Sequence, residues 1–450
     1  MNGSRRVPLR AGAALTDISP PAGVELAGYP HHPRHNRGIH DPLYAACLYL
    51  EDGGTRLAIV SADILMISKR YVQAVRAQVA ERTGIPPGNL MIACSHTHSG
   101  PWASGRLDLE ALERGLEPDK AYLQVLQRKL VDLVDEACED PFEARIGVDK
   151  GYCGREQGVG GNRHHPQEIA DPEVWVVGVQ DRQGRWRACL VRYALHPTFL
   201  HSDNLLVSAD YPGYLRSRLD ETHPGMVFLF AQGASGNQSP RFFRSGKTFA
   251  EAERVGVELA KAAERVLTGM ELEDAPALSA FSAETELELR SLPARGEAEA
   301  RVAAAKAEWE RLQAAGRPPE ELWIAELELL GAEDTLGYVL QNEKGRRLSL
   351  RDDELPAEVQ VLGIGDARLV GVQGELFAEL GLTIQYRSPF ARTVVVELAN
   401  GCLPGYAATA RAYAEGGYEA GTSLLSGRSG DRLVETAVEL LYRSRNAEPR

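Results

Sequence analysis

Short apolar runs rich in β-branched residues alternate with helical patterns along most of this chain. The alternation is clearest where a run at 56–65 precedes an amphipathic pattern at 68–84, which ends at Gly84, and a second run at 90–94. Strands that alternate with helices build layered α/β proteins, because each element covers an apolar face of its neighbour. We therefore expect an α/β fold of mixed β-sheets flanked by helices. Further strands are predicted at 143–148, 173–180, 187–195, 226–232, 358–365, 368–373 and 392–399, and further helices at 119–138, 247–268, 375–384 and 431–446.

One segment differs in composition from the rest. Residues 296–345 are rich in Ala, Glu, Leu, Arg and Lys, and a break at Gly316–Pro319 divides two helical patterns. We expect a helical pair inserted within a single catalytic domain that spans 1–450. This helical pair either contributes to packing or dimerisation, or forms a lid over the active site.

Charge and composition exclude several classes of function. With 50 basic and 63 acidic residues the net charge is −13, which argues against a nucleic-acid or anionic-membrane footprint and favours a neutral or cationic small substrate. The amino-terminal segment has no apolar stretch of signal-peptide length, and no window is apolar enough to span a bilayer. Six scattered cysteines fit structural thiols. We expect a cytoplasmic protein without stable membrane insertion. These properties are compatible with a homo-oligomer.

The sharpest local motif, Ser95-His96-Thr97-His98-Ser99, follows the run at 90–94. Residues i and i+2 of an extended segment face the same side, so His96 and His98 are expected to face one pocket about 7 Å apart. Imidazole is the commonest zinc ligand, and a second imidazole can ligate or shuttle protons. Polar loop chemistry is the alternative for an isolated pair.

Two further strand ends carry possible metal ligands. His196 follows the run at 187–195, and Glu375 follows Gly374 after the run at 368–373, at an expected helix start. Each has a structural explanation: a hydrogen-bonded histidine, and an acid that favours the helix dipole. Together with His96, however, they form the His₂Glu set typical of catalytic zinc.

Two glycine-rich loops complete the set of candidate segments. Ser239 stands in the loop Gly236-Asn237-Gln238-Ser239-Pro240, which lacks the Gly-x-Ser-x-Gly elbow of the α/β-hydrolases. Tyr406 and Tyr418 stand in late loops, where a tyrosine either packs, ligates zinc or donates to an oxyanion.

Taken in order, these segments resemble the catalytic domain of the neutral, alkaline non-lysosomal ceramidases. The resemblance is carried by Gly12–Pro21, Leu26–Tyr29, Gly38–Ala45, Ser61–Leu65, Ser95–Pro101, the Asn237–Pro240 loop, Gly371–Glu375 and the two tyrosines. It implies one catalytic Zn²⁺ held by His96, His196, Glu375 and Tyr406. It also implies roles for His98 beside the substrate, for Tyr418 and Arg163 at the amide oxygen, and for Ser239 in substrate binding.

The resemblance implies a zinc-dependent amidohydrolase that cleaves a linear N-acyl amide by attack of zinc-bound water, with His98 protonating the leaving amine. Members of that family carry a C-terminal immunoglobulin-like domain, which we do not expect here. A soluble amide is therefore expected as substrate in preference to ceramide. The alternatives are a metal-independent serine hydrolase using Ser239, a zinc esterase or deacetylase, and a non-catalytic binding protein.

Overall fold

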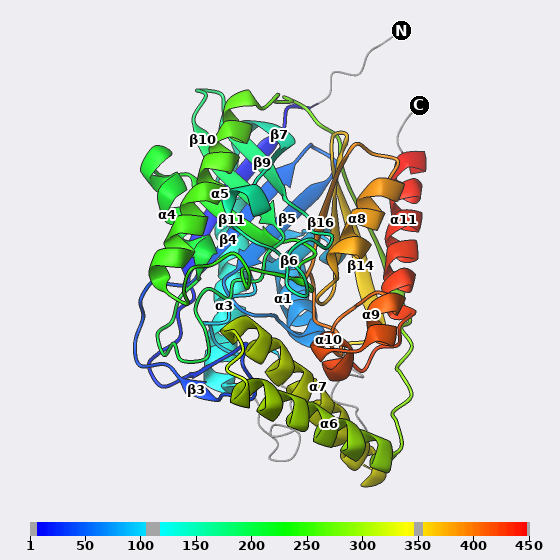
Figure 1. Ribbon diagram of the computed structural model, residues 1–450. Helices are drawn as coiled ribbons and strands as arrows, with labels where there is room; N and C mark the ends of the chain where they lie inside the picture. The colour runs from blue at the N-terminus through cyan, green and yellow to red at the C-terminus, as the bar shows by residue number, and fades with distance from the viewer. Residues whose placement is uncertain (1–6, 105–117, 346–353, 448–450) are drawn as a thin grey trace.

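The computed structural model describes residues 7–104, 118–345 and 354–447, and shows two β-sheets packed face to face with helices on their outer surfaces (Figure 1). This confirms the predicted α/β class with mixed sheets. The first six residues of the amino-terminal segment, for which no export signal was expected, lie outside the described part.

The larger sheet has eight strands in the order β11-β10-β9-β7-β1-β4-β5-β6. Neighbouring strands are antiparallel except for the parallel pairs β5–β6 and β10–β11. The strands span Arg10–Asp17 (β1), Tyr44–Glu51 (β4), Arg56–Ala62 (β5), Leu90–Cys94 (β6), Phe142–Tyr152 (β7), Glu173–Asp181 (β9), Trp186–Tyr193 (β10) and Val227–Gln232 (β11).

The smaller sheet has four strands in the order β13-β14-β15-β16, of which only β15 and β16 are parallel. They span Leu278–Thr285 (β13), Ala357–Ile364 (β14), Ala367–Val372 (β15) and Arg392–Val396 (β16). Two short pairs complete the strands: β2 (Glu25–Leu26) with β3 (Arg34–His35), and β8 (Gly161–Asn162) with β12 (Gln238–Ser239).

Alternation along the strands explains the layers, because successive side chains point to opposite faces of a sheet. Leu48, Ile59 and Met91 face the smaller sheet, in one core with Leu362 and Val394. The alternate residues face helices, in three outer cores. These helices are α1 (Lys69–Thr83) and α3 (Lys120–Glu139), α4 (Tyr211–Thr222) and α5 (Phe249–Gly269), and α8 (Ala378–Arg387) and α11 (Ser429–Ala447).

The predicted helical pair is present as α6 (Arg295–Ala314) and α7 (Pro319–Glu343). It is inserted between β13 and β14, which are hydrogen-bonded neighbours, and extends along the lower edge of the molecule in Figure 1. Helix α7 packs on the short helix α10 (Tyr418–Thr422), where the Tyr338 hydroxyl donates to the carbonyl oxygen of Thr422 at 3.0 Å. The insertion is thus attached to a loop that carries a candidate site residue.

Most predicted elements are present, with differences of a few residues at their ends. Strands β1, β4 and β13 and helix α4 were not predicted, nor were the four short strands and the short helices α9 (Ala410–Glu415) and α10. Strands β1 and β4 contain alanines, and α4 begins with Tyr211, Pro212 and Gly213 inside a loop-like sequence. The expectation that Glu375 starts a helix is wrong, since α8 begins at Ala378. Residues 375–377 are instead extended, and the amide of Ala407 donates to the carbonyl of Glu375.

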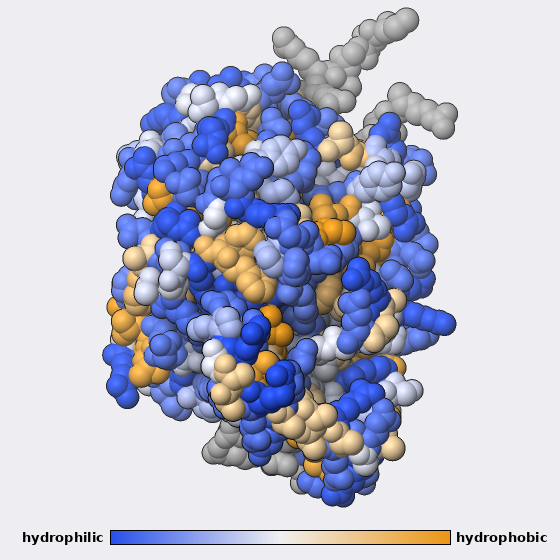
Figure 2. All heavy atoms as spheres, viewed as in Figure 1, coloured by the Kyte–Doolittle hydropathy of each residue, from blue (hydrophilic) through white to orange (hydrophobic). Residues whose placement is uncertain are grey.

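Hydrophilic side chains cover most of the face shown in Figure 2, with apolar residues scattered among them. In the described part of the chain, no helix is both long enough and apolar enough to cross a membrane.

Candidate functional site

Three strands from both sheets end at one place and deliver the candidate ligands. His96 lies two residues beyond β6, His196 three beyond β10, and Glu375 three beyond β15. His96 has a φ of 68°, in the left-handed region, which costs a residue other than glycine about 1–3 kcal/mol. Its amide donates to the carbonyl of Ile64 at 3.0 Å, which helps to hold this bend. The backbone is thus arranged to turn the His96 ring into the site.

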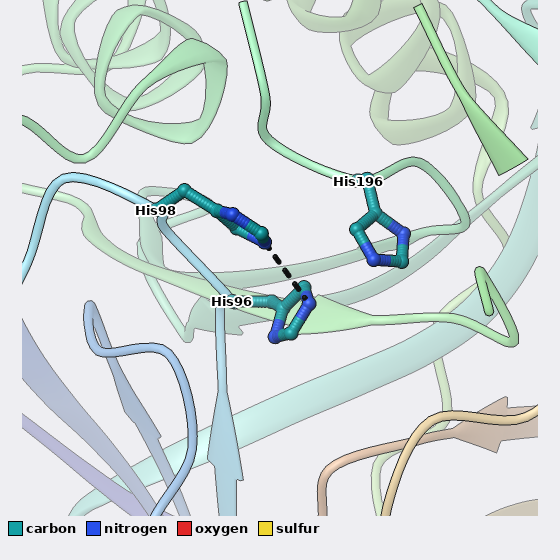
Figure 3. A group of neighbouring side chains, drawn as sticks. All are labelled: His96, His98 and His196. Atoms are coloured by element: carbon teal, nitrogen blue, oxygen red, sulfur yellow. Dashed lines mark hydrogen bonds between the residues drawn. The ribbon is translucent and has the colours of Figure 1, made fainter. Parts of the chain in front are cut away.

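The three side chains converge on one point. Glu375 Oε2 lies 3.1 Å from His196 Nε2 and 3.3 Å from His96 Nε2. The His96 and His196 rings are nearly perpendicular, with centroids 4.7 Å apart. Both histidines are 1% exposed and Glu375 is 9% exposed. Figure 3 shows the rings of His96 and His196 together with that of His98, around the same space.

The imidazoles are oriented for metal binding through their Nε2 atoms. Nδ1 of His96 lies 2.9 Å from the carbonyl oxygen of Leu65, and Nδ1 of His196 lies 2.8 Å from that of Ser235. A carbonyl can only accept, so each Nδ1 carries a proton, and Nε2 is the ring nitrogen available to a metal ion. Nitrogen atoms of His96, His98 and His196 all lie within 4.8 Å of one another and could hold a metal ion. The donor set therefore fits a divalent metal.

Burial and proximity shift the pKa values of these groups in opposite directions. Burial opposes the charged form of His96, but the carboxylate of Glu375 outweighs it and raises the pKa. Burial, aided by the positive charge of Arg163, lowers the pKa of His196 to about 4. For Glu375, the two histidines outweigh burial and hold the pKa well below its usual range. Glu375 is thus an anionic donor at neutral pH.

His98 is placed differently from the other two histidines. Its Nε2 lies 3.4 Å from His96 Nε2, whereas its Nδ1 has no hydrogen-bond partner among the described residues. Burial and the neighbouring His96 and His196 lower its pKa, so the ring is neutral. Only glycine fits at position 28, because φ is +95° and a Cβ there would lie 2.4 Å from the His98 ring. The ring is therefore positioned by packing, without the outer hydrogen bond typical of a ligand.

Arg163, Tyr406 and Tyr418 lie together beside the histidines. Arg163 Nη1 is 3.4 Å from His196 Nε2, and its guanidinium carbon lies 5.2 Å from the centre of the Tyr406 ring. The ring centroids of Tyr406 and Tyr418 are 6.1 Å apart. Arg163 is held by the buried Glu419, whose Oε1 accepts a hydrogen bond from Nε at 2.6 Å and forms an ion pair with Nη2 at 2.5 Å. Burial raises the pKa of both tyrosines, which remain protonated donors.

Ser239 lies in β12, where its Oγ accepts from the amide of Arg241 at 3.3 Å. Ser235 instead contacts a candidate metal ligand, with its Oγ 3.3 Å from His196 Nδ1. Ser235 Oγ donates to Glu397 Oε1 at 2.6 Å, and Glu397 Oε2 accepts from the amide of Leu376 at 2.6 Å. Glu397 thus ties the loop that orients His196 to the segment that carries Glu375.

Sequence reasoning missed Ser235, Glu397, Glu419 and Arg34. Arg34 clamps the histidine loop, because its Nη2 donates to the carbonyl oxygen of His98 at 2.6 Å and to that of Ala27 at 2.7 Å. Of these four residues, Glu397 could have been recognised from the sequence, because it is a charged residue at the end of an apolar strand pattern. The other three stand in polar surroundings that do not distinguish them.

The site opens into a cleft with two lobes. Both lobes share Gly28, Pro30, His98, Tyr406 and Tyr418. Helix α7 lines both, with Trp323, Leu327 and Leu330 in one and Asp334 and Tyr338 in the other. Every predicted site residue lines at least one of the two lobes. These residues are His96, His98, Arg163, His196, Ser239, Glu375, Tyr406 and Tyr418.

Comparison with known proteins shows which family this chain resembles. Residues 9–151 match the family model described as neutral/alkaline non-lysosomal ceramidase, N-terminal. The predicted resemblance to the neutral ceramidases is confirmed. Curated neutral ceramidases include one from Pseudomonas aeruginosa, 26% identical over 255 residues, and one from Drosophila melanogaster, 24% identical over 258 residues. These matches cover 52% and 51% of this chain but only 37% and 36% of the relatives.

The fold itself is that of a solved neutral ceramidase. The crystal structure of the enzyme from Pseudomonas aeruginosa superposes with a TM-score of 0.75 and 20% identity, covering 99% of this chain and 76% of that one. A structure titled as ceramidase complexed with C2 gives a TM-score of 0.74 at 18% identity. The ceramidase-like scaffold therefore extends well beyond the residues that the family model matches.

Proposed function

We propose that this protein is a zinc-dependent amidohydrolase that cleaves a linear N-acyl amide. The observation that carries the proposal is the convergence of His96 Nε2, His196 Nε2 and Glu375 Oε2, with separations of 3.1 and 3.3 Å from the carboxylate, at the floor of the cleft. Two neutral nitrogen donors and one carboxylate form the ligand set of catalytic zinc in hydrolases. The ceramidase-like sequence and fold support amide cleavage as the reaction.

His96, His196 and Glu375 would hold the ion, and we keep Tyr406 as a predicted fourth ligand. When bound, zinc supplies a Lewis acid that activates water and polarises a carbonyl. The hydrolysis adds water across the carbon–nitrogen bond, which breaks to give a carboxylic acid and an amine.

His98 would move the proton in this reaction. Because its pKa is lowered, the neutral ring accepts a proton before it can donate one. Its Nε2 faces the metal-binding nitrogens and can take a proton from the attacking water. The same atom can then deliver that proton to the leaving nitrogen.

Arg163 and Tyr418 would stabilise the carbonyl oxygen as it gains negative charge. Both are donors at neutral pH, and Glu419 fixes the guanidinium so that little reorganisation is needed. One preorganised donor of this kind contributes about 3 kcal/mol to a transition state.

Chelation and restoration test the proposal. The protein treated with dipicolinate should lose hydrolysis of N-acyl amides and regain it with added Zn²⁺. Activity that survives complete zinc removal would favour the metal-independent alternative with Ser239. Paired amide and ester substrates of equal shape distinguish an amidase from an esterase.

A further inference from the structure

The two lobes of the cleft differ in chemistry. The lobe beside His96 and Glu375 is lined by the apolar side chains of Leu65, Met66 and Trp102. The other lobe, beside His98 and His196, is lined by Arg241 and Arg244. The metal-binding residues stand between them, so a substrate whose amide lies at this point extends into both.

A row of aromatic rings leads from the site along the second lobe. The ring of Tyr29 lies 5.1 Å from that of His98 and 4.9 Å from that of His201, centroid to centroid. The His201 ring is in turn 4.4 Å from that of Trp323 on α7, and Lys247 Nζ lies 5.4 Å from the Trp323 ring. This row of aromatic rings therefore extends from the candidate metal site to the ammonium group of Lys247.

Of the arginines that line this lobe, Arg163 is paired with Glu419, whereas Arg241 and Arg244 have no carboxylate partner among the described residues. Arg244 Nη1 donates to the carbonyl oxygen of Thr198, and Arg241 Nη1 donates to that of Arg163 at 2.7 Å. Within the described ranges, neither arginine nor Lys247 forms an ion pair. Buried charges in proteins are nearly always paired, so partly buried arginines aimed into a cavity indicate a missing anion.

The field in the lobe is positive although the whole protein is acidic. Burial, reinforced by the charges of Lys247, Arg244, His32 and Arg34, lowers the pKa of His201 to about 2. Burial and the charge of Arg163 likewise lower the pKa of Arg241 to about 10.

Several acidic groups lie near this lobe: Glu419 is paired with Arg163, and Glu326 lies near Lys247 without an ion pair to it among the described residues. Asp203 and Glu320 are exposed to solvent. The buried carboxylate of Asp210 already accepts from the amides of Leu200 and Tyr211, and burial raises its pKa to about 7. The net charge of −13 therefore does not describe the lining of this lobe, where Arg241 and Arg244 form no ion pair among the described residues.

We infer that the substrate is an N-acylated amine with an apolar acyl half in the lobe of Leu65, Met66 and Trp102 and an anionic amine half, such as that of an N-acyl amino acid, against Arg244 and Lys247. The inference rests on the proposed amide hydrolysis and names its substrate class. A guanidinium binds a carboxylate or phosphate through charge-assisted hydrogen bonds. The shared requirement is a negative charge on the amine side of the scissile bond.

Two matched substrate pairs test the inference with the zinc-loaded protein. One pair is N-octanoylglycine and N-octanoylglycinamide, which differ only in the charge on the amine half. The other is the mono-N-ethylamide of octanedioic acid and its neutral diamide, which differ in charge at the acyl end. We expect a preference of about tenfold in kcat/KM for N-octanoylglycine over its amide, the effect of one charge-assisted hydrogen bond. The second pair should show no such preference.

Substitutions locate the effect. Arg244→Gln should remove most of the preference for N-octanoylglycine, mainly through KM, and Lys247→Gln should reduce it. Lys261→Gln, on the exposed surface of α5, makes the same change in net charge away from the cleft and should leave the preference intact. Lys247 is exposed, so its substitution does not threaten folding.

Binding without turnover separates this inference from the proposed function. N-(octylsulfonyl)glycine keeps the carboxylate but has no hydrolysable amide, and calorimetry should show that Arg244→Gln weakens its binding about tenfold. If no amide is hydrolysed but this binding depends on Arg244, the anion site stands and the proposed function fails. If amides are hydrolysed with no preference for the anionic amine half, or with a preference for the anionic acyl end, the inference is wrong.

Discussion

Arg163 and Glu419 form a buried ion pair that allows the structural role of the arginine to be measured apart from its proposed catalytic role. Their side chains are 7% and 4% exposed, and Glu419 Oε1 accepts a hydrogen bond from Nε of the guanidinium at 2.6 Å and lies 2.5 Å from Nη2. Replacing Arg163 with methionine would leave a buried carboxylate without its cation. We expect the free energy of unfolding to fall by about 3–5 kcal/mol, the usual cost of breaking a buried pair.

The double variant Arg163→Met with Glu419→Gln removes both charges. Most of the lost stability should return, because replacing both partners is often nearly neutral. Activity should not return, since the donor to the amide oxygen is still missing, and kcat should stay about 10²–10³ below that of the native protein.

Urea denaturation of the native protein, both single variants and the double variant gives the coupling energy, and the same preparations give kcat. His164 Nε2 is a second contact of this carboxylate, 3.3 Å from Glu419 Oε1. A destabilisation below about 1 kcal/mol for Arg163→Met would refute the assumption that the pair is desolvated. Recovery of kcat in the double variant would refute a catalytic role for Arg163.

Three further predictions concern the site and its surroundings. His96→Ala and Glu375→Ala should lose both zinc and turnover, whereas His98→Ala should keep zinc and lose about 10²–10⁴ in rate. Metal analysis of the three purified variants checks this. Zinc retained by both His96→Ala and Glu375→Ala would contradict the ligand assignment. Gly28→Ala should lower kcat at unchanged zinc content, because its Cβ would displace the His98 ring, and native-like kcat would contradict the packing. The pKa of Asp210 rises from 3.8 to about 7 on folding, so its contribution to stability is complete below pH 3.8 and is lost as the pH rises through 7. Urea denaturation between pH 4 and pH 8 should therefore show a smaller fall in stability for Asp210→Asn than for the native protein, and equal slopes would contradict the shift.

The strands and helices that bury an apolar face were largely predictable from the sequence. Periodicity identified β6 at 90–94, α1 with its end at Gly84, and the helical pair α6–α7, because in these segments the local pattern and the tertiary environment agree. Prediction failed where that agreement is weak. Strand β4 contains alanines, which have no strand preference of their own, and is ordered by pairing on both sides.

The sequence by itself determined which residues are candidates for holding a metal: two histidines and a glutamate, each just beyond a strand pattern and each in a recognisable motif. Only the tertiary structure decided that these ends meet, because β6 and β10 belong to one sheet and β15 to the other. Local pattern also could not reveal Glu419 behind Arg163 or Glu397 between Ser235 and Leu376. Such partners are separated by many residues along the chain, and their carboxylates gain a function only once folding removes water from around them.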